Sequence, residues 1–134
     1  DIDWVIQLFS RAKYISFLNG LAYAYRQHGN STASRSTEGP NHLAAIIQKW
    51  AEKVKQNEVP DPEVVAGLLA FEYGICMGHQ QYLSREMKII LKEYQYLLHY
   101  AMDKKTKVIR LFHRIFGYWF TCNMIRFYLF CRRI

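Results

Sequence analysis

Apolar residues at helical spacing are the feature that most constrains the fold of this chain. From Pro40 onward they recur three and four positions apart, as on one face of an α-helix. The first stretch contains Leu43, Ile46, Ile47, Trp50, Ala51 and Val54. Three further stretches follow, over about 62–82, 84–101 and 107–130. The sequence therefore predicts a mainly α fold, with a bundle of about four helices over 40–134.

Two of these helices have recognisable starts. Residues 61–63, Asp-Pro-Glu, supply an N-cap acid, a proline at the first helical position and an acid in the first turn. Ser84, or a neighbour, is expected to start the third helix. The second helix is apolar nearly all round, which predicts that it is the buried one. Small residues near one of its stripes predict that a neighbouring helix approaches closely there: Gly67, Gly74 and Gly78.

The first 39 residues have a different pattern. Residues 2–12 are expected to form a short helix and 13–18 a strand. Asn19-Gly20 is a strong hairpin signal, and 21–26 is the expected return strand. The polar stretch 27–39 is expected to be a loop. Because a lone hairpin is marginally stable in water, these strands are expected to complete a sheet that lies upstream.

Two domains are therefore expected, a remnant of an α/β domain over 1–39 and a helical domain over 40–134. The chain has 134 residues and does not begin with Met, so we expect it to be a piece of a longer protein. No apolar run is long enough to span a membrane. Three cysteines without tight spacing argue against a disulfide-stapled secreted domain and favour a reducing compartment.

The positive charge is confined to one end of the chain. Residues 1–103 hold ten Lys and Arg against eleven Asp and Glu, whereas 104–134 hold eight Lys and Arg and no acid. Such a segment is attracted to an anionic membrane, a nucleic acid or an acidic partner. The alternative is a solvated helix face whose Lys and Arg stems cover apolar neighbours. A membrane surface is the expected partner, nucleic acid is not expected, and a homo-oligomer stays open.

The last predicted helix is amphipathic. One side carries Val108, Phe112, Ile115, Phe116 and Trp119. The other side, or its edge, carries Lys107, Arg110, Arg114 and Thr121. Its uncharged run 115–125 would be about 16 Å long, roughly half a bilayer core, so it can lie on a membrane but not cross one. We expect an interfacial anchor; the alternative is that the apolar side is the bundle core.

Residues 1–3, Asp-Ile-Asp, could hold a divalent cation between two carboxylates. This D-x-D pattern opens a helix here, whereas a metal-binding one normally closes a hydrophobic strand. The alternative is that Asp1 or Asp3 caps the helix over 2–12, where a carboxylate favours the helix dipole.

An ordered set of motifs over about 1–37 resembles the C-terminal third of the catalytic domain of bacterial family-2 glycosyltransferases. The set consists of Asp1-Ile2-Asp3-Trp4, the strand over Lys13 to Phe17, Tyr23-Ala24-Tyr25-Arg26 and Gly29-Asn30-Ser31-Thr32. There are two departures from the family pattern. The Glu expected before Asp1 lies outside the sequence, and Asn30 stands where the family usually has Gly and Ser adjacent.

The resemblance implies an inverting transfer from a nucleotide-sugar donor to a hydroxyl acceptor. Asp1 matches the general base that deprotonates the acceptor. Arg26, His28 and Ser31 match positions near the donor diphosphate, where they would stabilise the leaving group. The alternatives are that Arg26 ends a strand and pairs with a carboxylate, that His28 is an exposed loop residue, and that Ser31 caps a turn.

The resemblance also implies that the nucleotide-binding half, with its divalent metal (Mg²⁺ or Mn²⁺), lies upstream. The fragment alone is then expected to be inactive. The expected function is thus the C-terminal part of a cytoplasmic family-2 glycosyltransferase, peripheral at the inner face of the membrane. Two alternatives stay open: a stand-alone basic helical module that binds an anionic membrane surface or partner, and a purely structural helical interaction domain.

Overall fold

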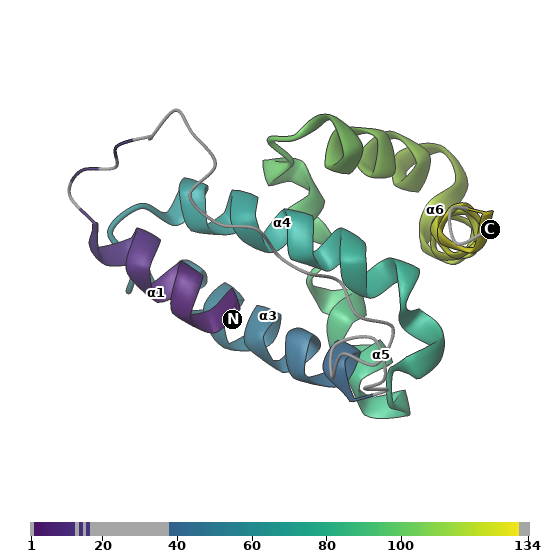
Figure 1. The fold of residues 1–134 in the computed structure, drawn as a ribbon, viewed down its shortest axis with the longest axis horizontal. Coiled ribbons are helices and arrows are strands. Elements are labelled where there is room, and N and C mark those ends of the chain that lie inside the picture. The colour runs from purple at the N-terminus through teal and green to yellow at the C-terminus, as the bar shows by residue number, and fades with distance from the viewer. Residues whose placement is uncertain (1, 13, 15, 17–37, 132–134) are drawn as a thin grey trace.

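The computed structural model describes residues 2–12, 14, 16 and 38–131. The α-helices among them are α1 (Ile2–Arg11), α3 (Gly39–Lys55), α4 (Pro62–Gly78), α5 (Arg85–Glu93) and α6 (Lys104–Cys131) (Figure 1). Two short 3-10 helices, η1 (Gln80–Tyr82) and η2 (Gln95–Tyr100), follow α4 and α5. The mainly α fold and the four helical stretches predicted after Pro40 are confirmed, and the described residues contain no strand.

The α4 helix lies at the centre of the fold. It packs against α3 on one side and against η2 and α6 on another (Figure 1). Its buried apolar residues include Val65, Ala66, Leu69, Ala70, Tyr73, Cys76 and Met77. The hydroxyl of Tyr73 donates to the carbonyl of Leu91 at 3.0 Å, so this buried polar group is satisfied. The prediction that this helix is the buried one is confirmed.

Polar side chains fix the helix starts. Asp61 Oδ1 accepts from the Val64 N–H at 3.3 Å, and Ser84 Oγ accepts from the Met87 N–H at 3.1 Å, as predicted. The start of α6 was expected near Lys107 but lies three residues earlier. The reason is Asp103, whose Oδ1 accepts from the N–H groups of two residues in the first turn of α6, at 2.9 and 3.0 Å.

Two of the three glycines of α4, Gly74 and Gly78, admit α6 as predicted, whereas Gly67 faces Met102 in the link between η2 and α6 and not a helix. A Cβ at Gly78 would lie 2.8 Å from both Ile125 Cγ2 and Leu129 Cδ1. A Cβ at Gly74 would lie 3.0 Å from Ile109 Cδ1. Both helices therefore come together at a distance that a larger residue would not permit.

The α1 helix packs on the helical bundle. Ile6 is only 1% exposed and belongs to the core that α3 and α4 share. Asp3 lies in the first turn of α1, and its Oδ1 accepts from Trp50 Nε1 at 2.7 Å and from Lys49 Nζ at 2.9 Å. The Asp3 carboxylate therefore joins α1 to α3, which differs from the capping role considered for it.

The remaining expectations for the N-terminal part lie outside the described residues. They concern the strands over 13–18 and 21–26, of which only residues 14 and 16 are described, and the turn at Asn19-Gly20. Most of the loop over 27–39 is also outside, although α3 begins at Gly39. The division of the chain into domains at residue 39 stays a prediction.

Candidate functional site

The four residues that the resemblance assigns to catalysis and donor binding are Asp1, Arg26, His28 and Ser31. All of them lie outside the described residues, so their roles stay predictions. In the described part of the chain, no three His, Cys, Asp or Glu side chains are close enough to hold a metal ion. The most unusual surface chemistry among the described residues is on α6.

The first segment of α6, residues 104–116, exposes a row of apolar side chains. Val108, Leu111 and Ile115 are 50%, 55% and 61% exposed, at the spacing of one helix face. The opposite face packs inward through Thr106 and Ile109. The apolar side considered as a possible bundle core is therefore largely at the surface, and the bundle core uses the other face.

A break at Gly117 divides α6 into two segments. Gly117 has φ 77° and ψ 177°, a conformation that glycine adopts readily and other residues do not. The first segment lies in the plane of Figure 1, whereas the second is seen end-on. The hydroxyl of Thr121 donates to the Gly117 carbonyl at 2.8 Å, so this carbonyl has a hydrogen-bond partner at the break. A single glycine within a helical stretch was the only sequence signal for this turn.

The second segment, residues 118–131, also has one buried and one exposed side. Cys122 and Ile125 face the core, where Ile125 meets Gly78. Its exposed side includes five large aromatic side chains, namely Trp119 (75%), Phe127 (68%), Phe130 (64%), Tyr128 (55%) and Phe120 (45%). Single exposed apolar residues are ordinary, but a concentration on one helix marks an interaction surface.

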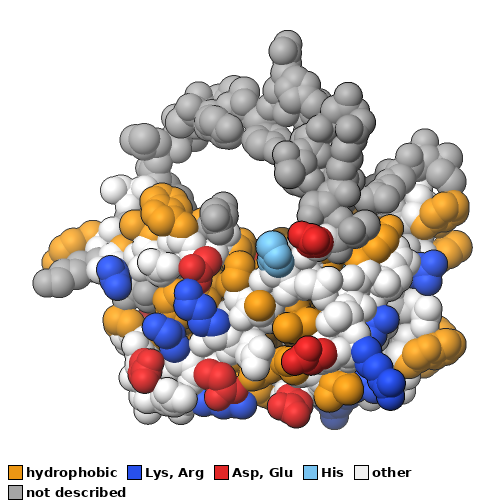
Figure 2. All heavy atoms as spheres, turned by 90° about the horizontal axis from the view of Figure 1, so that it is seen from below, with side chains coloured by type: hydrophobic (Ala, Val, Ile, Leu, Met, Phe, Trp, Pro, Cys, Tyr) orange, Lys and Arg blue, Asp and Glu red, His pale blue; other side chains and the backbone are white. Residues whose placement is uncertain are grey.

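The described part of α6 carries six cations and no acid: Lys104, Lys105, Lys107, Arg110, Arg114 and Arg126. Arg110 donates to the carbonyl of His99 at 3.1 Å. The ion pairs recorded among the described residues, Lys49 with Asp3 and Lys55 with Glu52, do not involve α6. Elsewhere on the molecule, acidic and basic side chains are interspersed, as on the face shown in Figure 2.

His113 adds little to this positive charge. Burial, together with the nearby His99, lowers its pKa below the ordinary value of 6.5. Its Nε2 lies 2.8 Å from Gln95 Oε1, so the ring is held by a neutral partner. At pH 7 the charge of α6 therefore comes from Lys and Arg.

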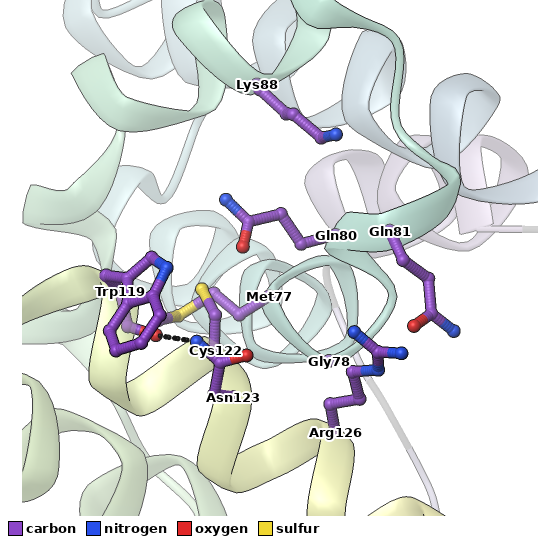
Figure 3. A pocket seen from close by; sticks show the side chains of 9 residues that line it. All are labelled: Met77, Gly78, Gln80, Gln81, Lys88, Trp119, Cys122, Asn123 and Arg126. Atoms are coloured by element: carbon purple, nitrogen blue, oxygen red, sulfur yellow. Dashed lines mark hydrogen bonds between the residues drawn. The ribbon is translucent and has the colours of Figure 1, made fainter.

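A cavity of about 240 Å³ lies where the second segment of α6 meets α4, η1 and α5 (Figure 3). Trp119, Asn123 and Arg126 line it from α6, and Lys88 lies on the opposite side, on α5. Gln80 lies between them. Sequence reasoning missed this cavity, because it forms only where the second segment of α6 packs beside residues 77–88, which lie about 30 residues earlier in the chain.

The comparisons with known proteins give no family for this chain. No family model matches it, and searches of curated proteins and of solved structures found no match. In the part of the chain that is described, no helix combines the length and the apolar character needed to cross a membrane. The function must therefore be argued from the surface of α6 and from the sequence motifs.

Proposed function

We propose that the helical part of this chain binds an anionic membrane surface, with α6 lying in the interface. The observation that carries the proposal is the exposed apolar row of Val108, Leu111 and Ile115, which has Lys107 and Arg114 beside it and no acid on the same helix. A helix with an apolar row and a cationic border is typical of segments that lie in the plane of the headgroups.

Apolar burial and charge would act together in this binding. Transfer of the exposed side chains out of water gives about 25 cal/mol for each Å² of apolar surface removed. Each Lys or Arg near an anionic surface adds about 1 kcal/mol. Trp119 suits the same boundary, since an indole has an apolar ring and a polar N–H. The one-sided charge favours lipid headgroups over an apolar protein partner, for which the cations would contribute nothing.

Vesicle cosedimentation tests the proposal. The protein should sediment with vesicles of phosphatidylglycerol and phosphatidylcholine and stay in the supernatant with phosphatidylcholine alone. The double substitution Leu111→Asn and Ile115→Asn should abolish sedimentation. Ile89→Asn is the matched control, because Ile89 is 59% exposed on α5 and does not belong to the apolar row of α6. Equal loss in the variant and the control would contradict a role for α6.

We propose as a second function that the chain is the C-terminal part of a family-2 glycosyltransferase. The support is the ordered set of motifs over 1–37, from Asp1-Ile2-Asp3-Trp4 to Gly29-Asn30-Ser31-Thr32. In this proposal Asp1 is the general base, Arg26, His28 and Ser31 contact the donor, and the divalent metal is held by the upstream half. The membrane contact of α6 would then place the enzyme at the cytoplasmic face.

The glycosyltransferase proposal is tested on the longer protein. The reading frame upstream of Asp1 should encode a strand-rich segment with an Asp-rich nucleotide motif. In that protein, Asp1→Asn should abolish sugar transfer and leave donor binding intact. The 134-residue chain alone should bind uridine-diphosphate sugars no more tightly than millimolar, about −4 kcal/mol. Full transfer by the Asp1→Asn variant would exclude Asp1 as the base.

A further inference from the structure

The second segment of α6 has an apolar stripe on the side that faces away from the core. Phe120, Phe127 and Cys131 are exposed and recur at the spacing of one helix face, with the half-buried Met124 between them. Phe120 is 45% exposed and Phe127 is 68% exposed, whereas the buried residues of the segment lie on its opposite face. Phe120, Met124, Phe127 and Cys131 together form the exposed stripe of α6.

Aromatic rings connect the exposed stripe to the first segment across the break at Gly117. Phe116, which is 51% exposed at the end of the first segment, has its ring centroid 4.8 Å from that of Phe120. The ring centroid of Phe112 lies 5.7 Å from that of Phe116. The rings of the two segments therefore form one continuous row around the bend.

The charges of α6 lie beside this row and not within it. Five of the six described cations of α6 precede the break, and Arg126 is the one cation that the structure describes after it. A second copy of the chain is a poor occupant for the stripe, because it would bring two sets of like charges together. An anionic membrane fits both features, because its headgroups attract the cations and its acyl chains accept the rings.

We infer that the exposed stripe inserts below the headgroups of an anionic membrane and selects membranes whose acyl chains are loosely packed. Bulky rings need space between the lipids, and the binding of interfacial helices depends on lipid composition and curvature for this reason. The first segment supplies the attraction to anionic headgroups, and the second segment supplies the insertion. This inference rests on the proposed membrane binding and deepens it, because it names the inserting residues and the kind of membrane.

Cys131 provides a probe for the insertion. It is exposed, whereas Cys76 and Cys122 are buried, and burial raises their pKa values to about 12 and about 11. Because the thiolate is the reactive form, a thiol reagent at neutral pH labels Cys131 selectively. A nitrobenzoxadiazole label on Cys131 should shift to the blue with anionic vesicles of dioleoyl lipids, and a nitroxide high on the lipid chains should quench it.

Glu58→Cys in a Cys131→Ser background is the matched control for the label. Glu58 is exposed and precedes α4, whereas the second segment of α6 packs at Gly78, the other end of α4. A label at position 58 should show neither the shift nor the quenching. A label on Cys131 that stays in water while the protein sediments with the vesicles would overturn the inference and leave the membrane proposal intact.

Vesicles of equal charge test the preference for loose packing. The protein should bind dioleoyl vesicles at least tenfold better than dipalmitoyl vesicles, whose chains are in the gel phase at room temperature. Phe120→Asn plus Phe127→Asn should remove this preference and the shift of the label, while salt-sensitive binding through the first segment remains. Phe9→Asn is the matched control, because Phe9 is an exposed phenylalanine on α1. Equal binding to both kinds of vesicle, or equal loss in the control, would overturn the inference.

The same label distinguishes the other occupant. A blue shift that rises with protein concentration in the absence of vesicles would assign the stripe to a second copy of the chain and overturn the inference. Failure of the wild type to sediment with any anionic vesicle would overturn the membrane proposal and this inference together. Sedimentation without the shift would overturn this inference alone.

Discussion

At the scale of single residues, Asp3 gives a physical reason for the position of α1. Its carboxylate accepts from Lys49 and Trp50, which hold α1 against α3, and from Gln7 within α1 itself. Packing therefore explains one of the two carboxylates of the D-x-D pattern that suggested metal binding, because Asp3 is hydrogen-bonded to α3. Asp1, the other carboxylate of the pattern, keeps its predicted role as a base.

Replacing Asp3 with Ala should lower the free energy of unfolding by about 1.5 kcal/mol at pH 7, the usual loss for a hydrogen bond to a charged group. The Lys49 ammonium and the Trp50 N–H hold the pKa of Asp3 below its ordinary value of 3.8. Stability from a lowered carboxyl pKa is present above pH 3.8 and is lost as the pH falls through the folded value. Urea unfolding over pH 3–7 should therefore show the two proteins converging in acid. A constant difference would contradict this.

Glu72 has a raised pKa, whereas the pKa of Asp3 is lowered. It is 8% exposed on α4, and burial raises its pKa above the ordinary 4.5. A raised carboxyl pKa means that stability is lost as the pH rises from 4.5 through the folded value. Glu72→Gln should therefore raise the thermal midpoint at pH 7, with the advantage disappearing below pH 4.5. Calorimetric scans check this, with the exposed Glu58→Gln as the control; a lower midpoint for Glu72→Gln at pH 7 would show that the carboxylate is stabilising.

At the scale of elements, the contact between α4 and α6 depends on small residues. Gly78 faces Ile125, a β-branched residue whose side chain cannot easily rotate away. The turn at Gly117 is needed for the same contact, because it redirects the second segment of α6 toward the end of α4. These two glycines therefore decide how the second segment of α6 is presented.

Gly78→Ala should destabilise the protein by about 1–3 kcal/mol, the usual cost of overpacking. The new Cβ would lie 2.8 Å from Ile125 Cγ2, so the second segment of α6 must shift. Gly39→Ala is the matched control, since a Cβ there meets no atom within 4 Å. Chemical denaturation should leave the control at or above the stability of the wild type. Equal stability of both variants would mean that the two helices are not packed as closely as described.

At the scale of the whole molecule, local sequence signals predicted the helices but not their spatial grouping. Asp61 and Ser84 correctly predicted helix starts, and the glycines of α4 predicted a closely packed neighbour. The exposure of Leu111 and the cavity at Arg126 could not be predicted in this way. Periodicity identifies an apolar face, but whether that face meets the core or the solvent depends on which other faces the bundle has already buried.

The same limit applies to the predicted catalytic residues. The roles assigned to Asp1, Arg26, His28 and Ser31 rest on a set of motifs. The order of the motifs is informative, but each motif alone is a weak indication of the family. Their geometry depends on a sheet that is expected upstream, so no pattern within this chain fixes it. The basic surface of α6, in contrast, was predictable from composition alone, because eight cations without an acid follow Asp103.

The central claim is that α6 binds an anionic surface through its cations and its exposed apolar row together. Vesicle cosedimentation across a salt series tests it most directly, with Lys107→Glu plus Arg114→Glu as the variant and Arg85→Glu on α5 as the control. The wild type and the control should bind phosphatidylglycerol vesicles and be released as the salt concentration rises, because salt screens surface charge. The variant should stay in the supernatant at every salt concentration. Salt-independent sedimentation, or equal binding of the variant, would contradict the claim.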